Sequence, residues 1–160
     1  MKKLFYLLLT PVLFFGCSKS TTCNYSDVTV FPSAVEIQNL KNWLDANSIP
    51  ATLHNPGFYY YIVTPGSGTF IANQCTTVTV SYVGKLENGT VFDQTSSGAT
   101  ATFQLGGLIG GWKAGLPLIA KGGRIILYLP PSLGYGSAAV GSIPANSDLI
   151  FDITLVDIQN

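Results

Sequence analysis

The stretch that most constrains this chain runs from Phe103 to Trp112 and places four glycines among apolar side chains. It contains no catalytic acid, base, nucleophile or metal ligand. Glycine lets the backbone lie close to whatever packs against it, and Leu108, Ile109 and Trp112 supply an apolar surface. We therefore expect this stretch to form the floor of any pocket, whose chemistry must depend on shape and on exclusion of water.

The N-terminal residues predict an export signal. Lys2 and Lys3 precede an apolar run, residues 4–15, which is too short to span a bilayer and fits the hydrophobic region of a signal peptide. Gly16 and Cys17 follow, and a small residue before a cysteine resembles the lipobox of bacterial lipoproteins, where the cysteine is acylated. We expect Cys17 to be lipidated; the alternative is a plain secretory signal, with Cys17 free or removed.

Cleavage before Cys17 would leave six basic and eight acidic residues, a net charge of −2. A mildly acidic chain has no basic field to attract nucleic acid, so we expect no nucleic-acid partner. An acylated Cys17 would hold the protein on a membrane surface without spanning the bilayer. The expected location is the cell envelope, lipid-anchored at the periplasmic side of the outer membrane.

Two further cysteines, Cys23 and Cys75, lie beyond the predicted signal. In an oxidising export compartment, such a pair is more often a structural disulfide than a metal or redox site. We expect a bridge between them, closing a loop of about 50 residues and stabilising the fold by about 3–4 kcal/mol in the chain-entropy treatment.

The pattern after Pro32 predicts one amphipathic helix. Ser33 and Glu36 have the spacing of a capping box. Apolar residues then recur at steps of three and four up to about Asn47, at Ala34, Ile37, Leu40 and Leu44. We expect this helix to pack on its own domain; the alternative is a helix that binds a partner or a second copy.

Short strands account for most of the remaining chain. Alternating apolar residues predict strands over 58–63, 77–86, 91–93, 101–105, 124–129 and 149–155, and helical spacing appears over 112–119. Asn88-Gly89 predicts a type I′ hairpin turn. The expected fold is α+β, with five or six largely antiparallel strands wrapped over a short helix. We divide the chain into a signal peptide (1–16), a tether (17–27), an extension with a helix and a strand (28–76), and a main domain (77–160).

The inventory of reactive residues excludes most enzyme classes. The single histidine, His54, lies beside Asn55-Pro56 and is expected to be a solvated turn residue, so no histidine-activated nucleophile is predicted. No cluster of ligands has metal-binding spacing, the carboxylates are scattered, and no phosphate-binding glycine motif is present. We expect neither a metal nor another cofactor. An apolar cleft lined by aromatic residues remains.

Three blocks of sequence together resemble the FKBP-type peptidyl-prolyl isomerases. The first runs from Val80 to Asp93 and the second from Phe103 to Trp112. The third begins with Pro-Ser-Leu-Gly-Tyr-Gly at Pro131 and continues through Ile143-Pro144 to Ile153. The blocks follow the family's order and approximate spacing over about residues 77–158, so the resemblance implies that 77–160 is an isomerase domain.

The resemblance also implies the residues of the site. Trp112 would form the floor, and Asp93 and Tyr135 would be polar members, with Tyr135 donating a hydrogen bond to a bound carbonyl. The catalytic set would be Tyr82, Phe92, Asp93, Trp112 and Tyr135, and the substrate-binding set Phe103, Leu108, Ile109, Ile143 and Phe151. For Phe103 and Phe151, plain core packing is the alternative. Ala101 stands where the family usually has a pocket aromatic, so we expect a wider cleft.

Such a site needs no covalent step. Rotation about an X–Pro bond must cross a barrier of about 18–20 kcal/mol, and a dry cleft that fits the twisted bond better than either planar form lowers it. The resemblance implies that unfolded or exported proline-containing polypeptides are the partners, and that macrolide inhibitors can bind. The alternatives are a chaperone-like binding module without turnover and a structural envelope protein. Residues 28–63 more loosely resemble the extension of exported FKBP-type lipoproteins, in which a Cys23–Cys75 bridge would join extension and core.

Overall fold

The computed structural model of the chain describes residues 23–160. The predicted signal peptide and Cys17 lie outside the described residues, as do residues 18–22 of the predicted tether. Within 23–160, none of the helices combines the length and the hydropathy that a membrane crossing requires.

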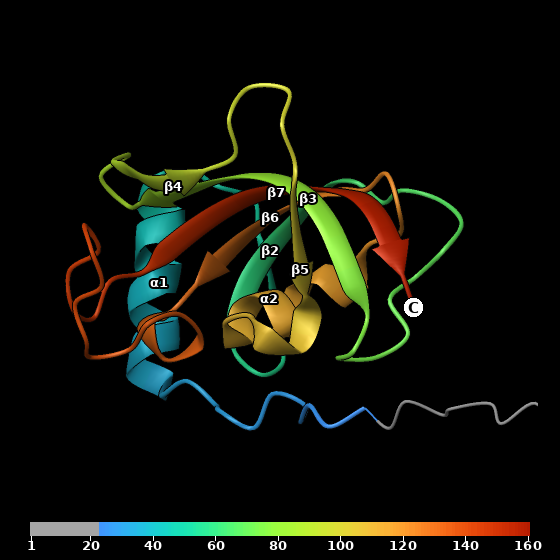
Figure 1. The fold of residues 1–160 in the computed structure, drawn as a ribbon. Helices are drawn as coiled ribbons and strands as arrows, with labels where there is room; N and C mark the ends of the chain where they lie inside the picture. The colour runs from blue at the N-terminus through green and yellow to red at the C-terminus, as the bar shows by residue number, and fades with distance from the viewer. Residues whose placement is uncertain (1–22) are drawn as a thin grey trace, which may run out of the picture.

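A single antiparallel sheet organises the described chain (Figure 1). Its strands are β1 (Thr52–His54), β2 (Phe58–Thr64), β3 (Thr77–Leu86), β4 (Val91–Gln94), β5 (Ala101–Gln104), β6 (Arg124–Leu129) and β7 (Leu149–Gln159). The order is β1-β2-β6-β7-β3-β4, and β5 also pairs with β3. The α+β prediction is confirmed, and each predicted strand is present. The sheet has seven strands in this part of the chain, not five or six, because β1 was not predicted.

His54 is placed differently from the prediction. It lies in β1, opposite Phe58 of β2, and is half-buried. Its ring centroid is 5.1 Å from that of Phe58 and 5.8 Å from that of Tyr60. His54 is therefore not a solvated turn residue, because pairing with β2 turns its ring onto these aromatics.

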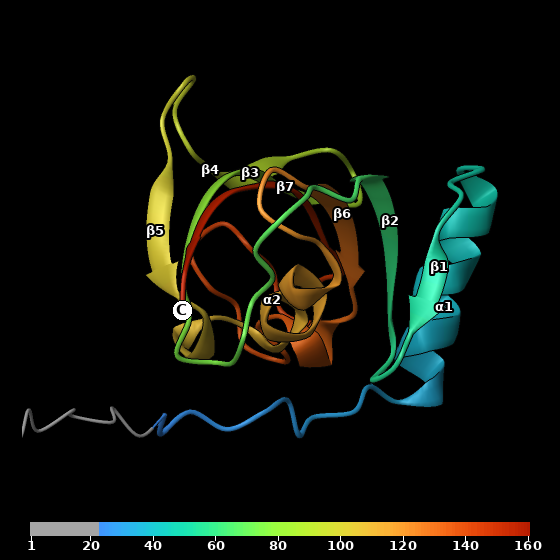
Figure 2. The same cartoon turned by 90° about the vertical axis from the view of Figure 1, so that its right-hand side faces the viewer.

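The sheet curls around α2 (Gly110–Gly115) and the 3₁₀ turn η2 (Leu116–Leu118) (Figure 2). The predicted helix over 112–119 is thus present, but its second half is tightened where Pro117 removes a backbone donor. The concave face of the sheet and α2 bury the main core, whose fully buried members include Val80, Leu116, Leu127, Ile153 and Leu155. A Cβ on Gly111 would lie 2.3 Å from the Leu129 side chain, so this glycine is what lets α2 approach β6.

Helix α1 (Ala34–Ala46) packs on the opposite, convex face, against β2 and β6 (Figures 1 and 2). The predicted capping box is confirmed: the Glu36 N–H donates to Ser33 Oγ, and the Ser33 N–H donates to the Glu36 carboxylate. Leu40 and Leu44 are buried against Tyr59 and Tyr128. The helix therefore packs on its own domain, as expected.

The turn between β3 and β4 differs from the predicted type I′ turn. That turn needs positive φ at both central residues, but only Gly89 has it, at 86°. The Gly89 N–H donates to the Leu86 carbonyl, and the Leu86 N–H donates to the Thr90 carbonyl, both at 2.9 Å. Asn88 Oδ1 instead accepts from the Thr90 N–H at 2.9 Å. The result is a three-residue loop in which the asparagine acts through its side chain.

Cys23 and Cys75 form the predicted disulfide, with Cα atoms 5.5 Å apart. Just after Cys23, the Tyr25 hydroxyl donates to Gln104 Oε1 at 3.1 Å.

The extension and the main domain share one sheet, because β2 pairs with β6 from Tyr59 to Thr64. The division of the chain at residues 27 and 76 stays a prediction.

Candidate functional site

A cleft of ≈ 140 Å³ opens between the concave face of the sheet and α2. Its lining consists of Tyr82, Asp93, Phe103, Leu108, Ile109, Trp112, Tyr135 and Phe151. Eight of the ten residues predicted to form a site are thus brought together from β3, β4, β5, β7, α2 and the loops between them. Their roles in binding and catalysis stay predictions.

Trp112 lies at the base of this cleft and is only 3% exposed. Three aromatic rings stand nearly perpendicular to its indole: Tyr82 at 86° and 5.1 Å, Phe151 at 88° and 5.3 Å, and Phe103 at 89° and 6.2 Å between centroids. Aromatic pairs favour such edge-to-face packing. The indole Nε1 is buried and finds no hydrogen-bond partner within residues 23–160. The arrangement is a flat apolar floor with rigid walls.

Phe92 and Ile143 were also predicted to line the cleft, but they are not among the eight residues of its lining. The Phe92 ring packs edge-to-face against Phe151, with ring centroids 5.4 Å apart and ring planes at 84°, so it supports that wall. Ile143 is buried in the main core and its backbone pairs with Val140 in an isolated bridge. Ala101 is also outside the lining, where it pairs with Val80 along β5, so the wider cleft stays a prediction.

The polar members of the cleft are arranged around one short hydrogen bond. The Tyr82 hydroxyl donates to Asp93 Oδ2 at 2.5 Å. Burial, together with this bond to the Asp93 carboxylate, raises the pKa of Tyr82, so its hydroxyl stays a proton donor throughout the physiological range. Tyr135 is 39% exposed and lies at the mouth, on the turn that follows η3 (Pro131–Leu133).

Two supporting contacts were missed by sequence reasoning. Thr95 Oγ accepts from the Tyr82 N–H at 3.1 Å, and the Thr95 N–H donates to the Tyr82 carbonyl at 3.1 Å. Glu36 of α1 accepts from the Ser132 N–H at 3.0 Å, directly before the turn that carries Tyr135. The capping box predicted a role for Glu36 within α1, but no local pattern signals a contact to a residue 96 positions away.

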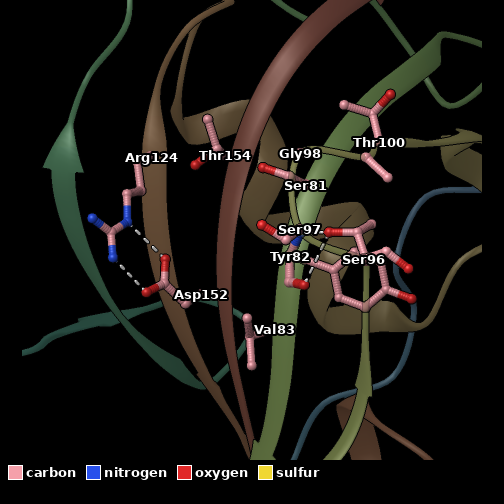
Figure 3. A pocket seen from close by; sticks show the side chains of 12 residues that line it. Ser81, Tyr82, Val83, Ser96, Ser97, Gly98, Thr100, Arg124, Asp152 and Thr154 are labelled. Atoms are coloured by element: carbon pink, nitrogen blue, oxygen red, sulfur yellow. Dashed lines mark hydrogen bonds and ion pairs between the residues drawn. The ribbon is translucent and has the colours of Figure 1, made fainter.

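A second hollow, of ≈ 390 Å³, lies on the convex face of the sheet (Figure 3). Hydroxyl side chains form much of its lining, including Ser81, Ser96, Ser97, Thr100 and Thr154. Arg124 donates to both carboxylate oxygens of Asp152, at 2.8 and 2.6 Å, along one side (Figure 3). This hollow is larger than the cleft, but water reaches its polar walls.

Residues 23–160 contain no group of three or more His, Cys, Asp or Glu side chains arranged to hold a metal ion. The chemical resources of the cleft are therefore an apolar floor, aromatic walls, one tyrosine–aspartate hydrogen bond and the hydroxyl of Tyr135.

Comparison with known proteins places this cleft in a family. Residues 68–156 match the family model described as FKBP-type peptidyl-prolyl cis-trans isomerase. The isomerase FkpA of Buchnera aphidicola subsp. Schizaphis graminum is 49% identical over 105 residues, which cover 65% of this chain and 42% of that protein. The FkpA of Escherichia coli K12 is 43% identical over 104 residues, covering 64% and 38%.

Solved structures agree with this placement. The crystal structure of Escherichia coli FkpA superposes with a TM-score of 0.70 at 36% identity, covering 79% of this chain and 60% of that one. A peptidyl-prolyl cis-trans isomerase of Pseudomonas syringae pv. tomato gives 0.68 at 25% identity, covering 82% and 99%. The chain spans about two fifths of the length of the curated relatives described above.

Proposed function

The chain belongs to the FKBP-type peptidyl-prolyl cis-trans isomerase family, and from that premise we propose that it catalyses the cis–trans isomerisation of X–Pro bonds in polypeptides. The observation that carries this proposal is the buried indole floor of Trp112 with three aromatic rings standing perpendicular to it. A flat apolar floor with upright walls suits a small saturated ring such as that of proline.

The size of the cleft supports a ring-sized ligand. An apolar cavity of about 150 Å³ holds one benzene ring and stays dry when empty. The cleft, at ≈ 140 Å³, has comparable room. A prolyl ring seated on Trp112 would displace the remaining water from both sides of the X–Pro bond.

Removal of water is the source of catalysis in this proposal. The planar amide owes its rotation barrier of about 18–20 kcal/mol to resonance, and resonance makes the planar amide more polar than the twisted one. A dry aromatic cleft therefore binds the twisted bond better than the planar bond, and this difference in binding accelerates rotation. The chain supplies no covalent intermediate and no proton transfer in this scheme.

Two polar groups would orient the substrate. The Tyr135 hydroxyl, at the mouth of the cleft, donates a hydrogen bond to a substrate carbonyl. Asp93 is held by Tyr82 through one carboxylate oxygen, which leaves its second oxygen to accept from a substrate backbone N–H. Both contacts fix the peptide on either side of the bond that rotates.

We further propose that the protein works outside the cytoplasm, attached by a lipid on Cys17 to the periplasmic side of the outer membrane. The lysines, apolar run and Gly16-Cys17 at the N-terminus support this location, as does the Cys23–Cys75 disulfide, since such bonds persist in oxidising compartments. Its clients would be exported proline-containing polypeptides. Labelled palmitate should be incorporated by the native chain and not by Cys17→Ser.

An isomerisation assay on a proline-containing peptide tests the enzymatic proposal. The purified protein should accelerate cis–trans exchange in proportion to its concentration, and a macrolide that occupies FKBP-type clefts should abolish the acceleration. Rates no faster than those of a Trp112→Ala variant would overturn the proposal.

The second candidate is a binding module. It is favoured by Ala101, which stands where the family usually has a pocket aromatic. Such a module would slow the aggregation of a client without changing the isomerisation rate.

A further inference from the structure

The carboxylate of Glu36 makes two separate sets of contacts. Its Oε2 atom accepts from the N–H of Ser33 at 2.8 Å and from the Ser33 hydroxyl at 2.9 Å, which completes the capping box of α1. Its Oε1 atom accepts from the N–H of Ser132 at 3.0 Å and also from the Ser132 hydroxyl. The contacts of Oε1 take no part in the cap of α1. They hold Ser132 instead.

Ser132 lies in η3, at the start of the turn that presents Tyr135 to the cleft. The carbonyl of Pro131 accepts from the N–H groups of Gly134, at 2.9 Å, and Gly136, at 2.8 Å, which are the two neighbours of Tyr135. Leu133 is fully buried in the main core. The turn is thus a small closed unit, and Ser132 is the point at which α1 holds it.

The contact is charge-assisted. Partial burial of Glu36 works against ionisation, but the hydrogen bonds from Ser132 and Ser33 outweigh it and lower the pKa of Glu36. The side chain is therefore a carboxylate at neutral pH. Hydrogen bonds to an ionised acceptor are about twice as strong as those between neutral groups, so Glu36 restrains Ser132 more firmly than a neutral side chain would.

From these contacts we infer that Glu36 is a positioning residue for Tyr135: the N-terminal helix sets where the hydroxyl at the cleft mouth lies. The inference rests on the proposed function for its effect on substrate. Glu36 lies outside residues 68–156, which match the family model, so this restraint on the cleft comes from the extension.

Four single variants of the full chain separate the two sets of contacts. Glu36→Ala removes both sets, and Glu36→Gln keeps an acceptor but removes the charge. Ser33→Ala removes only the two cap contacts of the Ser33 hydroxyl, and Ser132→Ala removes only the hydroxyl held by Oε1. Because Tyr135 would contact substrate before and during rotation, Glu36→Ala should raise KM by about three- to tenfold with little change in kcat, the range expected for one hydrogen bond. Ser33→Ala should lower the melting temperature and leave KM unchanged.

A double-mutant comparison distinguishes positioning from a general loss of structure. If Glu36 acts through the Tyr135 hydroxyl, Glu36→Ala should change KM by less than about twofold in a Tyr135→Phe background. An equal rise in KM in both backgrounds would overturn the inference. Glu36→Gln, which is the milder change, serves the same comparison if Glu36→Ala does not fold.

An NMR readout keeps this test independent of activity. The ring resonances of Tyr135 should shift in Glu36→Ala and Ser132→Ala and stay in place in Ser33→Ala. Unchanged Tyr135 resonances in Glu36→Ala would refute the positioning role even in an active enzyme. If the native protein lacks isomerase activity but these shifts occur, the proposed function fails and the positioning role of Glu36 stands.

Discussion

Two hollows of the described chain, the cleft and the hollow on the convex face, lie on opposite faces of one strand, β3. Tyr82 contributes its ring to the cleft on the concave face, and its neighbours Ser81 and Val83 line the hollow on the convex face. The convex hollow has ≈ 390 Å³ and the cleft only ≈ 140 Å³. The smaller one carries the proposed chemistry, because a fixed apolar lining that excludes water is what the reaction needs, and volume alone provides nothing.

The cleft and the convex hollow also differ in the interactions that hold their lining residues in place. The cleft is walled by rings packed edge-to-face on a buried indole. The convex hollow is bounded by hydroxyl groups and by the Arg124–Asp152 pair, whose side chains are 47% and 34% exposed. Rings in a dry core resist displacement, whereas exposed polar groups exchange protein contacts for water at little cost. Substitutions on the two faces should therefore have very different effects.

The largest effect is expected at the floor. Trp112→Ala should reduce kcat/KM at least about 100-fold and lower the free energy of unfolding by about 3–5 kcal/mol. Trp112→Phe, which retains a ring, keeps the fold if the alanine variant does not. The matched control is Trp43→Ala on the convex face, where the ring centroids of Trp43 and Tyr128 are 6.4 Å apart. Trp43→Ala should leave kcat/KM unchanged. Equal losses of kcat/KM in Trp112→Ala and Trp43→Ala would show that the two faces do not differ in their effect on activity.

The second prediction concerns the wall behind the cleft. A Cβ on Gly84 would lie 2.7 Å from the Phe92 ring and 2.9 Å from the Phe151 ring. The Phe151 ring is only 3% exposed and has little room to withdraw, so Gly84→Ala should cost about 1–3 kcal/mol of stability and shift the Trp112 fluorescence. Ser81→Ala on the opposite face should change stability by less than about 0.5 kcal/mol. Urea unfolding of the two variants gives the comparison directly.

The hydrogen bond between Tyr82 and Asp93 should have an intermediate effect. Tyr82→Phe and Asp93→Ala are each expected to lower the free energy of unfolding by about 1 kcal/mol, and the double variant should lose little more than either single one. The same cycle, measured on kcat/KM, should show the same coupling. Additive losses would mean that the two groups act separately, despite the 2.5 Å between their oxygens.

A pH dependence should arise at the end of the loop that leads into β7. Burial, with the neighbouring carboxylates of Glu87 and Glu36, raises the pKa of Asp148 to about 7. Since an unfolded aspartate has a pKa of about 4, the folded state holds this proton more tightly. Protonated Asp148 therefore adds to the free energy of unfolding. This contribution is complete below about pH 4 and is lost as the pH rises to about 7. Asp148→Asn should flatten that slope in urea unfolding, and Glu87→Gln should reduce it; an unchanged slope in Asp148→Asn would contradict this assignment.

The smallest effect is expected for the ion pair of the convex hollow. Arg124→Ala or Asp152→Ala should cost about 0.2–1 kcal/mol, as exposed ion pairs do, and this loss should shrink in 1 M salt, where screening shortens to about 3 Å. Neither variant should alter kcat/KM. A change of more than about threefold would show that the convex hollow takes part in the reaction.

Local signals predicted most of the architecture. Ser33 and Glu36 mark the start of α1 because the capping box is complete within four residues, and alternation located β3 and β7 because one face of each is buried. The three residues of β1 are too few to show a period, and they form a strand only through pairing with β2. The β3–β4 turn was missed because Asn88 caps Thr90 with its side chain rather than adopting positive φ.

The site was predictable from family resemblance to the level of its neighbourhood. Eight residues line the cleft, while Phe92 packs against Phe151 and Ile143 is buried in the main core. Which ring faces the cavity depends on how neighbouring rings stack, and that is decided in three dimensions. The bond from Glu36 to Ser132 likewise joins segments that no local pattern connects.

The disulfide has a mechanical consequence. Cys23 is bonded to Cys75, immediately before β3, so a pull on the chain ahead of Cys23 passes across this bond into the strand that carries Tyr82. Residues 24–74, including α1, lie in a closed covalent loop and bear none of that load. Tension from any attachment at the N-terminal end would therefore leave α1 docked on the convex face, with its hold on the cleft mouth intact.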